Sequence, residues 1–147
     1  MAVTSAAACE SGNQRPEGMS FNFAKNSATL KSEDVLRFAE WSIYLREKYP
    51  LQWASVVNGI AAPYEQNPRE LATRRAATIV QWAVKFGLAR RRIEASIELP
   101  KDISGWGDTP QAGGIDFIPG CPNDCCVDIT RPIQKDGEPP GLPRMTR

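Results

Sequence analysis

The sequence predicts an α/β fold, a sandwich in which two helices cover one face of a mixed, partly parallel sheet. Short segments with apolar residues at every second position alternate with longer segments whose apolar residues recur every three or four positions. Their order is βαβαβ, and short connections between strands and helices favour right-handed crossovers that place strands parallel. We assign this domain to residues 19–100, preceded by an N-terminal arm (1–18) and followed by a Pro/Gly-rich, Cys-containing C-terminal arm (101–147).

The first half of the domain is predicted to contain one strand and one helix. Residues 19–23 alternate apolar and polar side chains, as a strand with one buried face does. Ser32 is the expected N-cap of the helix, which should end at Tyr49 because the residue before Pro50 is disfavoured in helical geometry. The apolar stripe of this helix is assigned to Val35, Leu36, Ala39 and Ile43.

The second half is predicted to contain two strands around a helix. Residues 52–58 form a mostly apolar run typical of an interior strand. Asn67 is the expected N-cap of the second helix, with Pro68 in its first turn and Glu70 placed to close a capping box. Gly87 is expected to end this helix in a left-handed conformation. A strand with one buried face follows at residues 93–99; its apolar side chains are Ile93, Ala95, Ile97 and Leu99.

The C-terminal segment, residues 101–147, is interrupted throughout by glycine and proline. Only residues 126–130 alternate as a strand does, so we expect the rest to form an extended arm. Such an arm needs disulfides, the surface of its own domain or a neighbouring chain to hold it, and we favour a neighbouring chain. Trp106 is interpreted as an anchor that inserts into a pocket.

Composition excludes several classes of function. The 147 residues carry a net charge of +1, which provides no electrostatic drive toward nucleic acid. The chain has no histidine, which excludes Ser-His-Asp and Cys-His nucleophiles and most catalytic zinc sites. An enzyme based on carboxylates is the remaining alternative, but nothing in the sequence fixes two of them at a defined separation; the candidates are Glu65, Asp102, Asp108 and Asp116. No cofactor or metal is expected, and no stretch is long and apolar enough to span a bilayer.

The four cysteines all lie in the flanking arms. Cys9, Cys121, Cys125 and Cys126 are disulfide candidates, which would place the protein in an oxidising compartment. A bond between the adjacent Cys125 and Cys126 would be strained, so Cys9 or Cys121 is the better partner. Zinc binding is the alternative, although the spacing matches no standard motif. The small residues before Cys9 resemble the end of a lipoprotein signal, with Cys9 as a candidate lipidation site; without a preceding apolar segment, accidental likeness is the other interpretation.

Four motifs resemble the peptidoglycan-binding OmpA-like family (outer-membrane-protein-A-like). The opening strand and turn, residues 21–30, are similar to the start of those domains, and residues 56–59 resemble the glycine-containing end of their second strand. Residues 71–76, Leu-Ala-Thr-Arg-Arg-Ala, match the family's Leu-x-x-x-Arg-Ala helix signature. Phe86-Gly87-Leu88 followed by Arg92-Ile93 matches its helix-ending glycine and final strand, so the resemblance covers about residues 19–99.

The resemblance implies a site for the diaminopimelate moiety of peptidoglycan. In that family an aspartate after the second strand holds the ligand's ammonium group, and the signature arginine, here Arg75, holds its carboxylate. The aspartate is absent, because the corresponding position is Ala62 when counted from Gly59 and Ile60 when counted from Arg75. Glu65 is the candidate replacement, and Asn67 corresponds loosely to the family's loop asparagine. The alternative for Arg75 is a surface arginine paired with Glu70 or Glu65.

These observations predict a non-enzymatic structural subunit of a bacterial cell-envelope assembly, of the secretion or conjugation type, built on a degenerate OmpA-like domain. The expected location is the periplasm, with outer-membrane association as an option, and the expected partners are other subunits of the complex. The alternative is a functional peptidoglycan-binding module that anchors an envelope protein to the cell wall.

Overall fold

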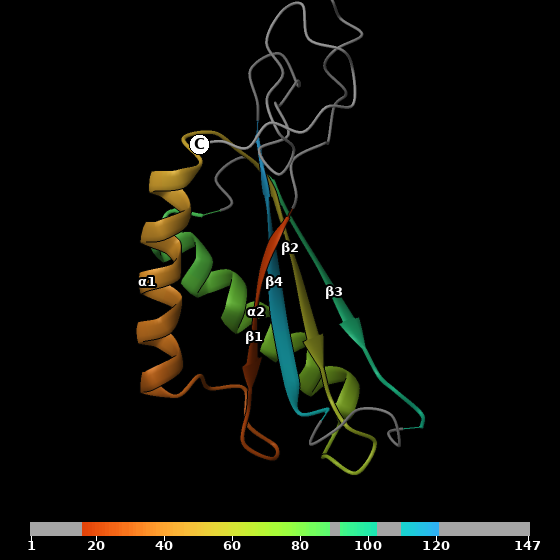
Figure 1. Cartoon of the computed structure of the whole chain (residues 1–147). Helices are drawn as coiled ribbons and strands as arrows, with labels where there is room; N and C mark the ends of the chain where they lie inside the picture. Colours follow the sequence, from red (N-terminus) through yellow and green to blue (C-terminus); the bar gives the residue numbers. More distant parts are fainter. Residues whose placement is uncertain (1–15, 89–91, 103–109, 121–147) are drawn as a thin grey trace, which may run out of the picture.

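A computed structural model describes residues 16–88, 92–102 and 110–120, which form a single four-stranded sheet with two helices (Figure 1). The elements in chain order are β1 (Glu17–Asn22), α1 (Ser32–Lys48), β2 (Gln52–Ile60), α2 (Pro68–Lys85), β3 (Ile93–Glu98) and β4 (Ala112–Pro119). The strand order is β1-β4-β2-β3. Strands β2 and β3 are parallel, whereas β4 is antiparallel to both of its neighbours. The mixed, partly parallel sheet that the sequence predicted is confirmed.

Strand β4 corrects the prediction for the C-terminal segment. Ala112–Pro119 was expected to belong to an extended arm, but it is an interior strand that pairs with β1 and β2. Gly113 is required for packing: a Cβ there would lie 2.7 Å from Cδ1 of Ile79 and 3.0 Å from the carbonyl oxygen of Asn58. The sheet therefore continues past residue 100. The other strand candidate, residues 126–130, and Trp106 lie outside the described residues.

The hydrophobic core lies between the sheet and the helices (Figure 1). On β4, Ile115 and Phe117 are buried while Asp116 between them is exposed, as a strand with one covered face requires. Phe38 of α1 packs against Phe21 of β1 with ring centroids 5.0 Å apart. The buried hydrophobic members of this core are Phe21, Phe23, Leu30, Phe38, Leu45, Tyr49, Val57, Ala76, Ile79, Ala83, Leu88, Ile115 and Phe117.

The face of helix α1 that packs against the core is not the predicted face. Phe38 and Leu45 are buried, whereas Leu36 and Ile43, assigned to the buried stripe, are 60% and 49% exposed. Both faces carry apolar residues at helical spacing, and the face with the phenylalanine is the one that meets the aromatic side chains of the sheet. The predicted N-cap is also wrong by one position: Lys31 is the N-cap, without a side-chain cap.

Helix α2 begins and ends where the sequence predicted. Asn67 is the N-cap and Pro68 lies in the first turn, but Asn67 adopts a left-handed conformation (φ 46°) and makes no side-chain cap, so the expected capping box with Glu70 is absent. At the other end Gly87 has φ +84°, and the N–H of Leu88 donates to the carbonyl of Ala83 at 2.8 Å. The left-handed glycine after the helix is confirmed.

Gly59 sets the distance between α2 and the sheet. A Cβ at this position of β2 would lie 2.1 Å from the carbonyl oxygen of Ala72 and 2.7 Å from the backbone nitrogen of Ala76. Only glycine permits so close an approach. The contact brings Arg75, which lies between those two alanines on α2, against the carboxyl end of β2.

Candidate ligand-binding site

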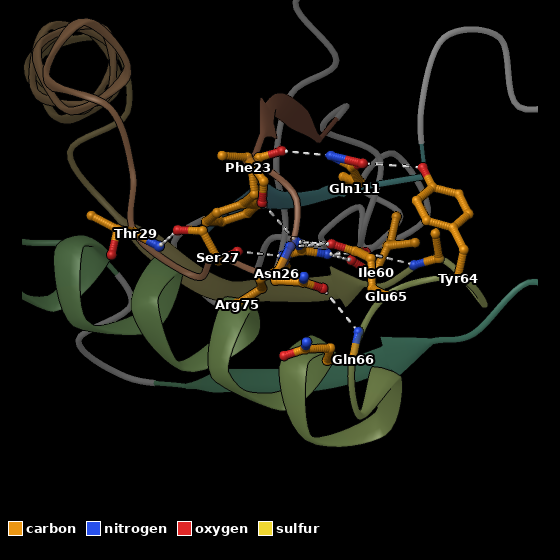
Figure 2. Close-up of polar contacts among 12 residues, drawn as sticks. Phe23, Asn26, Ser27, Thr29, Ile60, Tyr64, Glu65, Gln66, Arg75 and Gln111 are labelled. Carbon is orange, nitrogen blue, oxygen red and sulfur yellow. Dashed lines mark hydrogen bonds and ion pairs between the residues drawn. The ribbon is translucent and has the colours of Figure 1, made fainter.

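Arg75 is fully buried and forms a two-pronged ion pair with Glu65. Its Nη1 and Nη2 atoms donate to Oε1 and Oε2 of Glu65 at 2.8 and 2.5 Å, and both side chains are 0% exposed (Figure 2). Two parallel N–H···O bonds are the geometry in which a guanidinium group best recognises a carboxylate. Arg75 comes from α2 and Glu65 from the β2–α2 loop, so the pair fixes this loop against the helix.

The guanidinium group of Arg75 has no unused donor. Besides the two bonds to Glu65, Nε donates to the carbonyl of Ser27 at 2.8 Å, Nη1 to that of Ile60 at 2.8 Å, and Nη2 to that of Ala24 at 3.2 Å. A guanidinium group carries five N–H donors. All five are therefore occupied by the protein itself. The guanidinium carbon also lies 5.2 Å from the ring centroid of Phe23, within the range of a cation–π contact.

Both oxygens of the Glu65 carboxylate are likewise hydrogen-bonded within the protein. Its Oε1 atom accepts the N–H of Ala62 at 2.8 Å, and its Oε2 atom accepts the N–H of Asn26 at 2.9 Å, in addition to the bonds from Arg75. Burial raises the pKa of Glu65, but the hydrogen bonds from Arg75, Ala62 and Asn26, together with the positive charge of Arg75, outweigh it and hold the pKa below its usual value. Glu65 is thus a buried anion at neutral pH.

Two loops meet at this ion pair. The β1–α1 loop supplies Asn26, whose φ is 61° and whose Oδ1 atom accepts the N–H of Gln66 at 2.8 Å (Figure 2). Beside it, Tyr64 is 50% exposed and donates its hydroxyl to Oε1 of Gln111 at 3.1 Å. The exposed edge of the site is therefore formed by polar and aromatic side chains, whereas the charged Arg75–Glu65 pair at its centre is buried.

The structure brings together some of the predicted site residues and separates others. Arg75 and Glu65 are in direct contact, whereas Asn67 lies exposed at the start of α2. Ala62 and Ile60, the two positions where an aspartate was sought, each contribute a backbone group to the ion pair and no carboxylate. The alternative was a surface arginine paired with Glu70 or Glu65; its pairing with Glu65 is present, but the surface position is wrong because Arg75 is buried.

Sequence reasoning missed the contribution of the β1–α1 loop. Ala24, Asn26 and Ser27 supply three of the bonds that complete the pair, although they lie 39 to 51 residues from their partners in the sequence. The only local signal was an asparagine after a strand, a residue that tolerates the left-handed conformation seen at Asn26.

Of the other carboxylates predicted as candidate catalytic groups, Asp102 is exposed after β3. Asp116 is exposed on β4, and Asp108 lies outside the described residues. Within residues 16–88, 92–102 and 110–120 there is no cluster of three or more His, Cys, Asp or Glu residues suited to a metal ion. The same part of the chain has no helix with the length and apolar character needed to cross a bilayer. Cys9, Cys121, Cys125 and Cys126 all lie outside it.

Comparison with known proteins identifies the fold. Neither a family model nor a curated protein sequence matches the chain. Among solved structures, it is similar to the OmpA-like domain of FopA1 from Francisella tularensis, with 18% identity and a TM-score of 0.56 over 69% of this chain and 72% of that one. It is also similar to the periplasmic domain of MotB from Helicobacter pylori, with 13% identity and a TM-score of 0.56 over 72% of this chain and 78% of that one. The chain therefore has the fold of an OmpA-like domain.

Proposed function

We propose that this protein is a non-enzymatic structural subunit of a bacterial cell-envelope assembly, of the secretion or conjugation type, built on an OmpA-like domain whose ligand site is closed. The proposal rests on one observation: inside the protein, the Glu65 carboxylate accepts hydrogen bonds from both Nη1 and Nη2 of the Arg75 guanidinium group. In the family that the sequence resembles, this arginine holds a carboxylate of the ligand. Glu65 takes the place of that carboxylate here.

The energetics of the ion pair support a closed site. A ligand carboxylate reaches Arg75 only if Glu65 leaves, and Glu65 would leave behind the N–H groups of Ala62 and Asn26. Breaking a buried, hydrogen-bonded ion pair costs about 3–5 kcal/mol. That cost weakens ligand affinity by a factor on the order of 10²–10³ or more. The aspartate that would bind the ligand's ammonium group is also absent at Ala62 and Ile60.

The proposed location is the periplasm. The fold is shared with the periplasmic domain of MotB, which supports the proposal. Association with the outer membrane, lipidation at Cys9 and disulfides among Cys9, Cys121, Cys125 and Cys126 belong to the same proposal, as does the inserted anchor Trp106. In this role the domain is a packing module, and the partners are other subunits of the assembly.

The alternative function is a peptidoglycan-binding module that anchors an envelope protein to the wall. The observation that favours it is the guanidinium geometry itself, which already holds a carboxylate in two-pronged fashion. The exposed Tyr64 and Asn67 lie on the loop that a ligand would approach. For this function, Glu65 must move aside when the ligand enters.

Co-sedimentation with isolated peptidoglycan distinguishes the two functions without altering the buried pair. Wild-type protein is mixed with purified sacculi, with and without excess free diaminopimelate, and an OmpA-like domain that retains the loop aspartate serves as the positive control. The structural role predicts that the protein stays in the supernatant while the control pellets. Pelleting that free diaminopimelate reverses would establish the anchoring function and refute the closed site.

A further inference from the structure

Helix α1 carries a second apolar line on the side that faces away from the core. Leu36 and Ile43 lie seven residues apart, on the same side of the helix, and are 60% and 49% exposed. The opposite side of α1 buries Phe38 and Leu45. In Figure 1, α1 lies at the flank of the domain next to the β1 edge, so its outer side has no neighbouring helix or strand among the described elements.

Glutamates alternate with these apolar residues along the same line. The spacing is three, four, three and four, which keeps all five residues on one stripe of the helix. We call this set the acidic–apolar stripe; its members are Glu33, Leu36, Glu40, Ile43 and Glu47. All five are exposed.

The three glutamates of the stripe have no ion-pair partner among the described residues. Within the same part of the chain, none of them forms a hydrogen bond. Two of the three basic residues of α1 pair with other carboxylates: Arg37 with Asp34 at 2.8 Å, and Lys48 with Glu17 at 3.2 Å. The third, Arg46, lies against Gly87 at the end of α2. The chain as a whole has a net charge of +1, so this row is a local feature and not the result of a generally acidic surface.

The charge of the stripe excludes two simple occupants. An anionic membrane surface would repel a row of glutamates. A second copy of this chain fits poorly, because pairing of two stripes about Glu40 places Glu40 opposite Glu40 in either the parallel or the antiparallel orientation. Shifting one helix by three or four residues places an apolar residue against a glutamate, and shifting it by seven again places glutamate against glutamate. The stripe itself contains no Lys or Arg that could pair with a glutamate of the second copy.

We propose that the acidic–apolar stripe of α1 binds a basic amphipathic helix of a partner subunit. The partner helix carries Lys or Arg opposite Glu33, Glu40 and Glu47, and apolar side chains that pack against Leu36 and Ile43. Helices commonly bind a partner helix through anchors spaced three, four and seven residues apart. Alternating opposite charges fix the register and reject partners of the wrong sign. This inference rests on the proposed role as a subunit of an assembly and names the chemistry of one partner.

A pair of designed peptides tests the inference on the full chain. Each peptide has about 20 residues, long enough to form a helix, with Leu and either Lys or Glu alternating at spacings of three and four. Binding of the fluorescently labelled peptides is measured by anisotropy at low and at moderate salt. The variant Glu40→Lys is compared with Glu70→Lys, which makes the same change of charge at an exposed position of α2. Thermal unfolding of each variant confirms that it is folded.

The expected result is binding of the Lys peptide that weakens with salt and falls about tenfold in Glu40→Lys but less than about twofold in Glu70→Lys. Ile43→Ser should weaken the same peptide, and Glu40→Lys should shift preference toward the Glu peptide. Three results would overturn the inference: no binding of the Lys peptide, equal binding of both peptides, or self-association that Ile43→Ser abolishes. None of them depends on whether the protein sediments with peptidoglycan, so the two proposals fail independently.

Discussion

Replacing Glu65 by glutamine removes one charge from the buried ion pair and leaves its shape nearly unchanged. Each carboxylate oxygen accepts two hydrogen bonds: Oε1 from Arg75 and Ala62, and Oε2 from Arg75 and Asn26. Whichever oxygen becomes the amide nitrogen, two N–H donors then face another donor. Arg75 keeps its bonds to the carbonyls of Ser27, Ile60 and Ala24 but has no anion.

The expected cost follows from that geometry. A buried cation that loses its hydrogen-bonded partner destabilises a protein by about 3–5 kcal/mol, a large part of the 5–15 kcal/mol that is typical of a domain's stability. We therefore expect Glu65→Gln to lower the free energy of unfolding by about 3–5 kcal/mol and the melting temperature by roughly 10–20 °C. Urea denaturation with an unchanged slope is the assay.

The matched control is Glu40→Gln, which makes the same chemical change at an exposed position and should alter stability by less than about 0.5 kcal/mol. A loss smaller than about 1 kcal/mol in Glu65→Gln would refute the reasoning. It would mean that Arg75 does not depend on this carboxylate and that the ion pair does not hold the two loops together.

Three further predictions concern acid stability and two glycines. Because the pKa of Glu65 is lowered in the folded protein, its contribution to the free energy of unfolding is present above its ordinary pKa of 4.5 and is lost as pH falls through the lowered value. In acid denaturation followed by circular dichroism, the stability of Glu65→Gln should therefore depend less steeply on pH in this range than that of the wild type. Gly59→Ala should lower the free energy of unfolding by about 3 kcal/mol or more, because the added Cβ would lie 2.1 Å from the carbonyl oxygen of Ala72. In the control Gly114→Ala the nearest contact of the Cβ is at 3.3 Å, so the loss measured by urea denaturation should be about 1 kcal/mol. Gly87→Ala should cost about 1–2 kcal/mol in the same assay because φ is +84°, and an unchanged midpoint would contradict the left-handed cap.

Local sequence signals were sufficient for most of the fold. Hydrophobic periodicity and the signals at Asn67, Pro68 and Gly87 gave the order of the first five elements and the limits of α2, because each of these features acts within one turn of the chain. The period-two pattern in β4 was also present, with Ile115 and Phe117 alternating with small and polar residues. Its glycines were interpreted as breaks, since the close approach to Ile79 that requires Gly113 is a tertiary contact.

The site was less predictable because its chemistry depends on non-local contacts. The family resemblance identified Arg75, and Glu65 was named as a substitute carboxylate, but their burial could not be inferred from spacing along the chain. The β1–α1 loop closes over the pair through Asn26 and Ser27, which lie far from it in the sequence. Likewise, the sequence did not show which of the two apolar faces of α1 is buried, because this depends on the tertiary contact with Phe21 of β1.

Side-chain NMR of Arg75 tests the central claim, that Glu65 occupies the ligand's place, most directly. The Nε–Hε resonance of Arg75 is assigned and followed while a soluble peptidoglycan fragment containing diaminopimelate is added. The closed site predicts a slowly exchanging Hε signal, bonded to the carbonyl of Ser27, that does not shift as the fragment is added up to millimolar concentration. A saturable shift of that signal, accompanied by a change in the Glu65 carboxylate resonance, would contradict the account and show that the ligand displaces Glu65.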